Sequence, residues 1–419
     1  MEHRIQYRSQ LFQALSPGMR ALCAFTVVLT LGAAASTVAQ AQTYSVLYSF
    51  GVGAHGADPW SGVVLDNAGN IYGTADQGGD YGTQCTKLGC GVVYKLSPAG
   101  KETVLHKFTN TKSDGFWPTY GTVLRDASGD IYGTTVYGGP GANGIVFELK
   151  KGAKKETILH TFPSQTGDGA APECGLIEDA AGNLYGTTFA GGASGELSAG
   201  TVFKITKTGQ ESVLHSFVGT DGFGPVAGLV EDSAGNLYGT ASSGGSAGWG
   251  TVFKISAAGD FSVLYTFQGY LTGDGGLASA GSPMVLDSAG NLYGVTTSGG
   301  NAHICPGFGC GVIFKLDPAG NETILHTFVS TDGIAPNGVI FDAAGNLWGT
   351  TTFGGTHDEG TIFKLDPSGN LTTLYNFTGD PTDGGAPFAG LTQDSAGNFY
   401  GTTSQGGKRG AGVAFKLTP

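Results

Sequence analysis

The chain has 419 residues, of which 75 are glycine; 40% of its residues are hydrophobic and only 13% are charged. This composition excludes a disordered polar chain and a bundle of membrane helices. The glycine content also argues against long helices, because a glycine inside a helix costs about 1 kcal/mol relative to alanine. The net charge of −12 disfavours nucleic acid and anionic membranes as partners, since both attract positive surfaces.

Residues 1–41 have the pattern of a secretory signal peptide. A basic leader precedes an apolar run over residues 21–35, and the small-residue site Ala39-Gln40-Ala41 follows it. An uncleaved membrane anchor is the alternative, although the run is shorter than the ~20 residues that span a bilayer. We therefore expect cleavage after Ala41, a secreted or periplasmic protein without membrane contact after cleavage, and a single domain over residues 42–419.

After this leader, a lone strand is predicted at residues 46–50, and one nonapeptide then occurs seven times. Each copy begins with an aspartate, has glycine at its fourth position, and ends on an aromatic residue, a glycine and a threonine or valine. The glycine supplies a positive φ and the aspartate bonds back to the backbone, which predicts a tight hairpin turn. A ring of metal ligands is the alternative role for these aspartates. The copies begin at Asp66, Asp126, Asp179, Asp232, Asp287, Asp342 and Asp394.

Each repeat contains four short strands rich in β-branched and aromatic residues. Strand a precedes the aspartate, as at residues 228–231, and strand b carries the aromatic-Gly-Thr motif after the turn. Strand c is a run such as residues 251–255, and strand d is a run such as residues 213–217. The a–b and c–d hairpins should lie on one face, and the variable b–c loops and d–a crossings on the other.

Seven such units predict an all-β, seven-bladed β-propeller. The chain enters through a strand of type d and finishes on a strand c at residues 413–417, so the last blade lacks an outer strand of its own. The N-terminal strand can complete that blade in a 3+1 closure, which removes the exposed edges of an open array. A β-solenoid is the alternative, but it would not need strands divided between the two chain ends.

Four cysteines form two Cys-x4-Cys pairs, Cys85 with Cys90 and Cys305 with Cys310. In an oxidising compartment each pair predicts a local disulfide that pins a loop. A shared four-cysteine zinc site is the alternative, although the two pairs lie in distant repeats. Cys174 is expected to be a buried free thiol, and no cofactor is predicted.

The recurring motif, followed by Gly-Gly and a Gly-x-[Val/Ile]-[Phe/Tyr]-Lys-[Leu/Ile] run, resembles the bacterial tandem-repeat family called GloVer, known for variable anchors. It is more distantly similar to sensor-type and streptogramin-lyase-like propeller repeats. The resemblance covers about residues 44–419. It implies a propeller fold and export, but no defined activity. Members can carry a C-terminal sorting tail; here the sequence stops right after strand c, so we expect free secretion.

Side chains that recur from blade to blade are expected to build the blades. The histidines of strand d share their position with tyrosines in other copies, so we expect packing and hydrogen bonding from them. The aspartates of the d–a crossings should make one face electronegative, and a cation or calcium role is the alternative to a turn role. The histidines are His106, His160, His215 and His326, and the crossing aspartates are Asp114, Asp168, Asp221, Asp274, Asp332 and Asp383.

Residues that occur only once are the better binding candidates, and several fall on the variable face. Aromatic side chains among carboxylates could stack on sugar rings or grip a peptide, whereas ordinary solvated loops are the alternative. These candidates are Trp60, Trp117, Trp249, Phe388, His303, His357, Asp358, Glu359, Lys408 and Arg409. Arg125, Glu178 and Glu231 should face the central channel, where they converge on a polar ligand or form an ion-paired wall.

The sequence shows no catalytic signature such as a nucleophile elbow, a phosphate loop or a zinc-protease motif. Our leading hypothesis is a monomeric, non-enzymatic module that binds a carbohydrate, a peptide or a protein. One alternative is a lyase or hydrolase that acts on a glycan or small cyclic substrate at the channel mouth through Glu178, Glu231 or His357. Another alternative is a structural component of a surface layer or a component that mediates adhesion.

Overall fold

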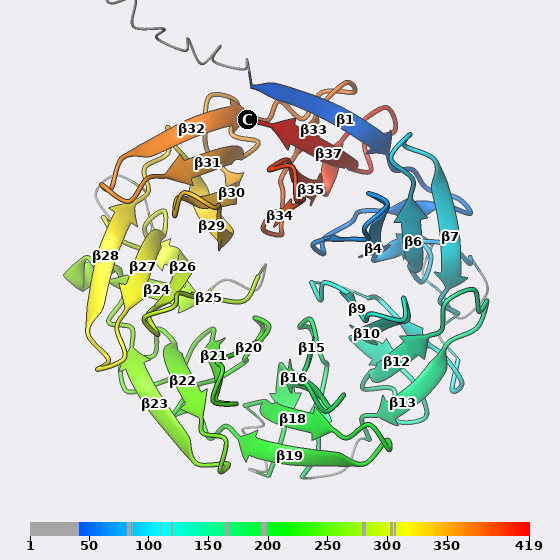
Figure 1. Ribbon diagram of the computed structural model, residues 1–419, viewed down its shortest axis with the longest axis horizontal. Coiled ribbons are helices and arrows are strands. Elements are labelled where there is room, and N and C mark those ends of the chain that lie inside the picture. The colour runs from blue at the N-terminus through cyan, green and yellow to red at the C-terminus, as the bar shows by residue number, and fades with distance from the viewer. Residues whose placement is uncertain are drawn as a thin grey trace, which may run out of the picture. The chain divides into compact units, whose positions relative to one another are not determined.

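The structure is a computed structural model that describes residues 42–81, 85, 87–109, 111–118, 120–163, 167–193, 199–278, 282–301, 305 and 307–419. The expected signal peptide at residues 1–41 and the candidate His303 lie outside these described residues. Residues Gln42–Pro419 form one compact unit. Figure 1 shows its sheets arranged as a ring around a central channel, which confirms the predicted all-β, seven-bladed propeller.

Each blade is an antiparallel sheet whose strands run from the channel to the outside in the order a, b, c, d. Blades 1 to 3 contain β3 (Val64–Leu65), β4 (Ile71–Ala75), β6 (Val92–Leu96) and β7 (Glu102–Lys107); β9 (Leu124–Arg125), β10 (Ile131–Thr135), β12 (Ile145–Leu149) and β13 (Thr157–Thr161); and β15 (Ile177–Glu178), β16 (Leu184–Thr188), β18 (Thr201–Ile205) and β19 (Glu211–Ser216).

Blades 4 to 6 follow the same order. They contain β20 (Val230–Glu231), β21 (Leu237–Ala241), β22 (Thr251–Ile255) and β23 (Phe261–Thr266); β25 (Val285–Leu286), β26 (Leu292–Gly299), β27 (Val312–Leu316) and β28 (Glu322–Thr327); and β29 (Ile334–Phe341), β30 (Leu347–Phe353), β31 (Thr361–Leu365) and β32 (Leu371–Asn376).

Blade 7 contains strands from both ends of the described chain. Its strands are β34 (Thr392–Gln393), β35 (Phe399–Thr403), β37 (Val413–Thr418) and, on the outside, β1 (Thr43–Ser49). β1 runs antiparallel to β37, from the pair Thr43 and Thr418 to the pair Ser49 and Val413. Figure 1 shows this blue strand lying along the red one.

Short ribbons cover the loop face, where each d–a crossing meets the following b–c loop. They contain β2 (Gly56–Ala57) with β5 (Gln77–Gly78), β8 (Gly115–Phe116) with β11 (Tyr137–Gly138), β14 (Gly169–Ala170) with β17 (Ala190–Gly191), β24 (Gly275–Ala278) with the end of β26, and β33 (Gly384–Gly385) with β36 (Gln405–Gly406). The described part of the chain also has one short 3-10 helix, η2 (Tyr270–Thr272), and no helix there is long and apolar enough to cross a bilayer.

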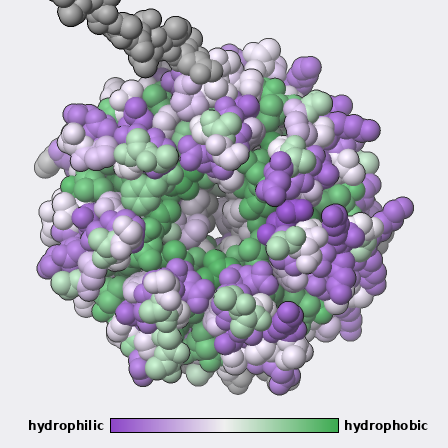
Figure 2. Space-filling view, viewed as in Figure 1, coloured by the Kyte–Doolittle hydropathy of each residue, from purple (hydrophilic) through white to green (hydrophobic). Residues whose placement is uncertain are grey.

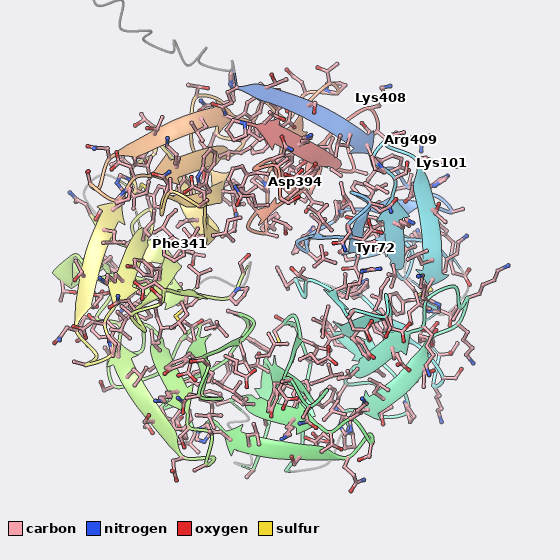
Figure 3. All side chains as sticks on the ribbon, viewed as in Figure 1. Tyr72, Lys101, Phe341, Asp394, Lys408 and Arg409 are labelled. Carbon is pink, nitrogen blue, oxygen red and sulfur yellow. A yellow bond between two sulfur atoms is a disulfide. The ribbon has the colours of Figure 1, made fainter. Side chains whose placement is uncertain are left out.

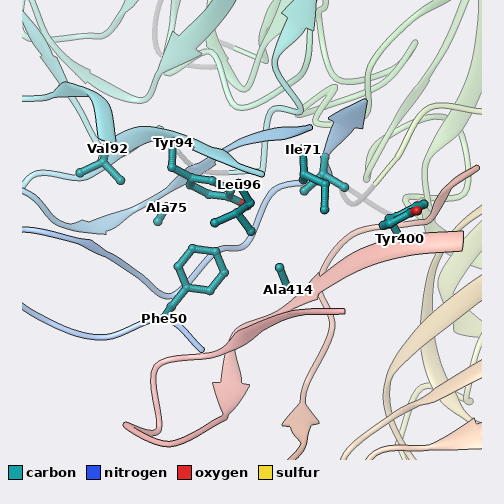
Figure 4. Close-up of a cluster of buried hydrophobic side chains, with 9 residues drawn as sticks. Phe50, Ile71, Ala75, Val92, Tyr94, Leu96, Tyr400 and Ala414 are labelled. Atoms are coloured by element: carbon teal, nitrogen blue, oxygen red, sulfur yellow. The ribbon is translucent and has the colours of Figure 1, made fainter. Parts of the chain in front are cut away.

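The hydrophobic core lies between neighbouring blades. Figure 4 shows one such cluster, in which Phe50, Tyr94 and Leu96 pack near Tyr400 and Ala414 of blade 7. The glycine of the aromatic-Gly-Thr motif makes this packing possible, because a Cβ at Gly133, for example, would lie 2.7 Å from the ring of Phe147. A side chain at this position would therefore push the blade's own aromatic residue out of the core.

The a–b hairpins owe their shape to the turn aspartate, as the sequence predicted. In the last copy, the Asp394 carboxylate accepts hydrogen bonds from the backbone N–H of Ala396 and Asn398, the Asn398 amide and the Tyr400 hydroxyl, at 2.8–2.9 Å. This set of bonds explains why aspartate, asparagine and tyrosine recur together in the motif.

On the loop face, the residue at the end of each d–a crossing has a left-handed backbone. Its N–H donates to a carbonyl of the preceding blade, as from Trp117 to Cys90 and from Ala386 to Glu359, at 3.1 and 2.9 Å. Because these bonds join neighbouring blades, the left-handed positions belong to the architecture. They are Asp58, Trp117, Ala171, Gly224, Leu277, Ala335 and Ala386, with φ between 50° and 61°.

The central channel contains a cavity of about 340 Å³ that is lined by the strands a. Most of its lining is apolar, with side chains such as Leu176 and Ile340, and Figure 2 shows hydrophobic residues around the opening. The crossing of blade 5 narrows it, because Ser282 reaches past blade 6 and its hydroxyl accepts a hydrogen bond from the Gly390 N–H at 3.0 Å. The channel is therefore not the polar, ion-paired wall that the sequence left open.

Candidate binding site at the channel mouth

Three aromatic side chains from blades 7, 1 and 2 meet where the channel opens on the loop face. The rings of Trp60 and Phe388 stack with centroids 4.7 Å apart and planes 11° apart. The Tyr120 ring stands edge-on to Trp60, with centroids 5.3 Å apart. All three side chains are partly exposed, and Tyr120 lines the channel cavity. We call Trp60, Tyr120 and Phe388 the mouth aromatics.

The threonine of the repeated motif holds the mouth aromatics in place from the neighbouring blade. The Thr402 hydroxyl of blade 7 donates to the Ser61 carbonyl at 2.8 Å, next to Trp60. The Thr74 hydroxyl of blade 1 donates to the Pro118 carbonyl at 3.0 Å, two residues before Tyr120. These buried bonds across blade boundaries fix the backbone of the mouth.

Tyr120 has an unusual backbone conformation. Its φ is 53°, in the left-handed region that bulky side chains rarely adopt. The segment from Pro118 to Asp126 is also one residue longer than the corresponding segment from Pro59 to Asp66. Local strain of this kind costs about 1–3 kcal/mol and concentrates at functional sites. The strained backbone at Tyr120 therefore marks the mouth as a candidate site.

Three carboxyl groups accompany the mouth aromatics. Asp58 lies two residues before Trp60, and its carbonyl accepts a hydrogen bond from the Asp76 N–H at 3.3 Å. Asp76 is only 8% exposed, and its Oδ1 has no hydrogen-bond partner among the described residues. Glu173 follows the crossing proline of blade 3 and is half-buried. We call Asp58, Asp76 and Glu173 the mouth carboxyls.

The surroundings of the mouth carboxyls raise their pKa values. Burial, and then the nearby Asp58 carboxylate, raise the pKa of Asp76 to about 8. Burial raises the pKa of Glu173 to about 7 and also raises the pKa of Asp58. The pKa of Tyr120 rises to about 12 through burial and the charges of Glu173 and Asp76. Titrating groups in contact with an aromatic platform are typical of binding and catalytic sites.

Sequence reasoning named Trp60 and Phe388 but missed Tyr120 and the mouth carboxyls. A position-by-position comparison of the seven copies could have identified these residues. At each of their positions, the other blades have other residue types, as expected for a residue that does not build the repeat. At the position of Asp76, the other blades have Val136, Phe189, Ser242, Thr297, Thr352 and Ser404.

The other predicted tryptophans lie in separate aromatic groups. Trp117 packs edge-on against Phe116 and Tyr137, with centroids 5.7 Å from each. Trp249 packs near Tyr270, with centroids 5.3 Å apart, and its ring lies against Gly269 and Gly276 in the crossing of blade 5. Neither group includes a mouth aromatic.

The predicted polar loop residues lie in separate places on the loop face and do not form one site. The Asp358 carboxylate accepts a hydrogen bond from the Gly354 N–H at 2.9 Å, and Glu359 lies against Gly379 and Gly385 in the next crossing. His357 contacts the neighbouring Thr356 hydroxyl at 3.2 Å. Figure 3 places Lys408 and Arg409 at the outer edge of the ring, away from the channel.

Arg125, Glu178 and Glu231 do not converge in the structure. The Arg125 guanidinium lies over the Tyr72 ring of blade 1, 5.2 Å from its centroid. Burial, Asp126 and Asp179 raise the pKa of Glu178, whereas Lys207 lowers it. Burial, Asp179 and Asp232 raise the pKa of Glu231, and Lys204 lowers it. Arg125 lines the channel cavity, as expected, whereas Glu178 lines a separate cavity with Asp126 and Lys207.

The strand d histidines and crossing aspartates form seams between blades. His106 Nε2 lies 3.3 Å from Asp114 and 2.9 Å from Glu156 of the next blade, and all three are buried. His160, Asp168 and Glu211 repeat this arrangement, and both groups have the donor set of a metal site.

At another seam, the Tyr265 hydroxyl lies 3.0 Å from an oxygen of Asp274 and 2.8 Å from an oxygen of Glu322, and its single proton is donated to one of them at a time. Because a hydroxyl serves there as well as an imidazole, the shared role is a hydrogen-bond donor between two carboxylates. The sequence predicted that the crossing aspartates make one face electronegative. This prediction is wrong for Asp114, Asp274 and Asp383, because these three side chains are buried in the seams.

Both predicted disulfides are present, Cys85 with Cys90 and Cys305 with Cys310, and Cys174 is a buried free thiol. Each disulfide closes a b–c loop. The carbonyls of Cys90 and Cys310 accept the hydrogen bonds from the left-handed residues Trp117 and Ala335 at 3.1 and 2.9 Å. The disulfides therefore brace loops that bond directly to the next blade.

Comparison with solved structures supports the fold alone. The extracellular domain of a protein assigned to the one-component systems, from B. thetaiotaomicron, is similar over 86% of this chain, with a TM-score of 0.51 and 12% identity. This chain spans only 39% of the chain in that structure. A gluconolactonase from Xanthomonas campestris has a TM-score of 0.43 and 12% identity over 90% of this chain and 89% of its own.

Among curated proteins, none matches this chain. The family model described as the Gloeobacter/Verrucomicrobia repeat matches residues 30–199 and 284–419. These two segments contain most of the repeat copies, in agreement with the resemblance that the motif indicated. The chain belongs to the Gloeobacter/Verrucomicrobia repeat family.

Proposed function

We propose that this propeller is a binding module that holds a carbohydrate at the channel mouth. The observation that carries the proposal is the stacked pair Trp60 and Phe388, with Tyr120 beside it and the mouth carboxyls around it. The apolar face of a sugar ring packs on aromatic rings, and its hydroxyl groups bond to carboxyl groups. The mouth offers both kinds of contact within one small area.

The mouth is also built to bind without large rearrangement. The threonine hydroxyls of neighbouring blades fix the backbone on both sides of it, and the stacked rings support one another. A site that is ordered before the ligand arrives avoids the cost of ordering its side chains on binding. We therefore infer recognition by a preformed surface.

We further propose that the protein works outside the cytoplasm. The two disulfides support this location, because disulfides persist in oxidising compartments and are rare in the cytoplasm. Fractionation of the producing cells, followed by detection of the chain with its N-terminus sequenced, tests both the location and the expected cleavage after Ala41. An intact N-terminus in the cytoplasmic fraction would contradict the proposal.

A glycan array followed by calorimetry with the best oligosaccharide tests the binding function. Trp60→Ala and Phe388→Ala should each weaken binding about tenfold, because an aromatic side chain that stacks on a nucleic-acid base contributes about 1–3 kcal/mol and a sugar ring would lose a similar stacking contact. Tyr137→Ala is the matched control, since Tyr137 is an aromatic residue of the loop face that is 41% exposed and lies outside the mouth. Equal losses for all three variants, or no bound glycan at all, would count against the proposal.

One observation favours a second function, cleavage of a glycan at the same mouth. Asp76 and Glu173 have pKa values raised to about 8 and about 7 and flank Tyr120, so an acid and a base could both operate near neutral pH. The release of new reducing ends from the bound oligosaccharide, lost in Asp76→Asn and Glu173→Gln, would support this function. Stable oligosaccharide after prolonged incubation would leave binding as the function.

A further inference from the structure

The charges at the mouth all have the same sign. Asp58, Asp76 and Glu173 supply three carboxyl groups, and no lysine or arginine acts on the pKa of any of them. Arg125 is the charged side chain among the residues that line the channel cavity, and its guanidinium lies over the Tyr72 ring. Six strand c lysines lie over strand b aromatic rings at 5.2–5.9 Å, namely Lys95, Lys204, Lys254, Lys315, Lys364 and Lys416.

Asp76 is the part of this cluster that most needs a partner. Its side chain is more than nine-tenths buried, and its Oδ1 has no hydrogen-bond partner among the described residues. A buried carboxyl without a donor or a counter-charge is costly and stays protonated. A positive charge beside this carboxyl would remove this cost and would keep the carboxylate ionised.

The mouth aromatics favour the same kind of ligand. A cation over the face of tryptophan or tyrosine is attracted by the ring, by about 0.5–2 kcal/mol depending on how dry the site is. The Tyr120 ring packs edge-on to Trp60, and the charges of Glu173 and Asp76 both act on the Tyr120 hydroxyl, so the aromatic group and these carboxyls are close neighbours. Aromatic faces with carboxylates are the combination that recognises amines.

We propose that the ligand of the mouth is an amino sugar with a free, positively charged amino group, with its ring on Trp60 and its ammonium group at Asp76. This inference rests on the proposed carbohydrate-binding function and names the class of sugar. An acidic sugar would bring a second negative charge to the mouth carboxyls. A neutral sugar could donate a hydroxyl to Asp76 Oδ1 but would leave no counter-charge there. Both should therefore bind more weakly.

Binding of such an amine should release a proton. At pH 6 the Asp76 carboxyl is protonated in the free protein, because its pKa is raised to about 8. An ammonium group beside it favours the carboxylate, so the proton leaves as the ligand binds. Asp58 is the charged group that acts on this carboxyl, and Asp76 and Glu173 both act on the neighbouring Tyr120 hydroxyl.

The experiment compares glucosamine trisaccharide with its N-acetylated form by calorimetry at pH 6, in two buffers of different ionisation enthalpy. We expect the free amine to bind at least tenfold more tightly and to release close to one proton. Asp76→Asn should abolish both the preference for the free amine and the release of the proton. Asp380→Asn is the matched control, because Asp380 is an exposed carboxylate of the same face and should leave both values unchanged.

The outcomes separate the two proposals. Binding of the N-acetylated or a neutral sugar at least as tight as that of the free amine would overturn the amine inference and leave carbohydrate binding standing. Binding of no sugar would overturn both. The comparison of the two trisaccharides uses the unchanged protein, so it decides the matter even if Asp76→Asn fails to fold.

Discussion

Single residues in this propeller show how hydrogen bonds decide the pKa of an acid or a base. Partial burial acts to raise the pKa of Asp394, but hydrogen bonds from Asn398 and Tyr400 outweigh it and lower the pKa. At Asp76, burial and the Asp58 charge outweigh the one hydrogen bond that acts on the carboxyl, from its own N–H, and raise the pKa to about 8. An aspartate carboxyl is therefore held ionised by donors at the hairpin turn, whereas burial favours its protonated form at Asp76.

Replacing Asp394 by alanine should lower the free energy of unfolding by about 1–2 kcal/mol at pH 7, because the turn loses its acceptor. A lowered pKa contributes stability above the ordinary aspartate value of about 3.9, and this stability is lost as the pH falls through the folded-state pKa. The difference from the unchanged protein should therefore shrink toward pH 3 in urea unfolding. Asp380→Ala serves as control, and an equal effect there would contradict the capping role.

Two histidines at equivalent positions should give opposite pH dependences. Burial acts to lower the pKa of His106, but bonds to Asp114 and Glu156 outweigh it and raise the pKa to about 9. Its contribution to stability is full below about pH 6.5 and is lost as the pH rises through 9. Burial lowers the pKa of His215, so its contribution is lost instead as the pH falls below about 6.5.

Thermal unfolding between pH 5 and pH 10 checks this pair. His106→Gln should flatten the alkaline side of the stability profile, and His215→Gln should flatten the acidic side. Each variant is the control for the other. Identical profiles for the two variants would show that the seams do not set these pKa values.

At the scale of elements, the outer strand β1 completes blade 7. Val46 and Tyr44 of β1 pack in the core cluster that contains Phe415 and Leu417. The Tyr48 hydroxyl donates to Glu102 of blade 1 at 2.9 Å, and His55 contacts the same carboxylate. β1 therefore joins blade 7 both to its own sheet and to the neighbouring blade.

Deleting residues 42–50 should expose the edge of β37 and part of this core. We expect a lower unfolding temperature, loss of a single cooperative transition, and self-association through the free edge. Calorimetry and light scattering measure these changes, with deletion of Gln42 alone as the control. A monomer with an unchanged transition would mean that β1 contributes little to the ring.

At the scale of the whole molecule, the mouth exists only because the ring brings blades 7, 1 and 2 together. Trp60 and Phe388 are far apart in the sequence, yet their rings stack. The Thr402 hydroxyl crosses the same boundary to the Ser61 carbonyl. The equivalent Thr187 hydroxyl crosses from blade 3 to the Pro225 carbonyl of blade 4 at 2.9 Å.

This equivalence provides a matched pair of variants. Thr402→Val and Thr187→Val should each lower the free energy of unfolding by about 1–2 kcal/mol, because a buried carbonyl loses its donor. Of these two variants, only Thr402→Val should also weaken sugar binding, by several-fold, since the Thr402 bond supports the mouth and the Thr187 bond does not. Binding measured by calorimetry and stability measured by urea unfolding separate the two effects. A binding loss in Thr187→Val alone would contradict the position of the site.

The repeat determined by itself the number of blades, the hairpins with their aspartate caps and the two disulfides. These features depend on residues that are close in the chain, such as Asp394 with Asn398 or Cys85 with Cys90, and the pattern repeats in phase. The tertiary structure alone decided that Tyr120, Asp76 and Glu173 join Trp60 and Phe388, and that Arg125, Glu178 and Glu231 stay apart. The reason is that burial and contacts between blades depend on how neighbouring blades are oriented around the ring. Residues that are close together in the sequence do not determine this orientation.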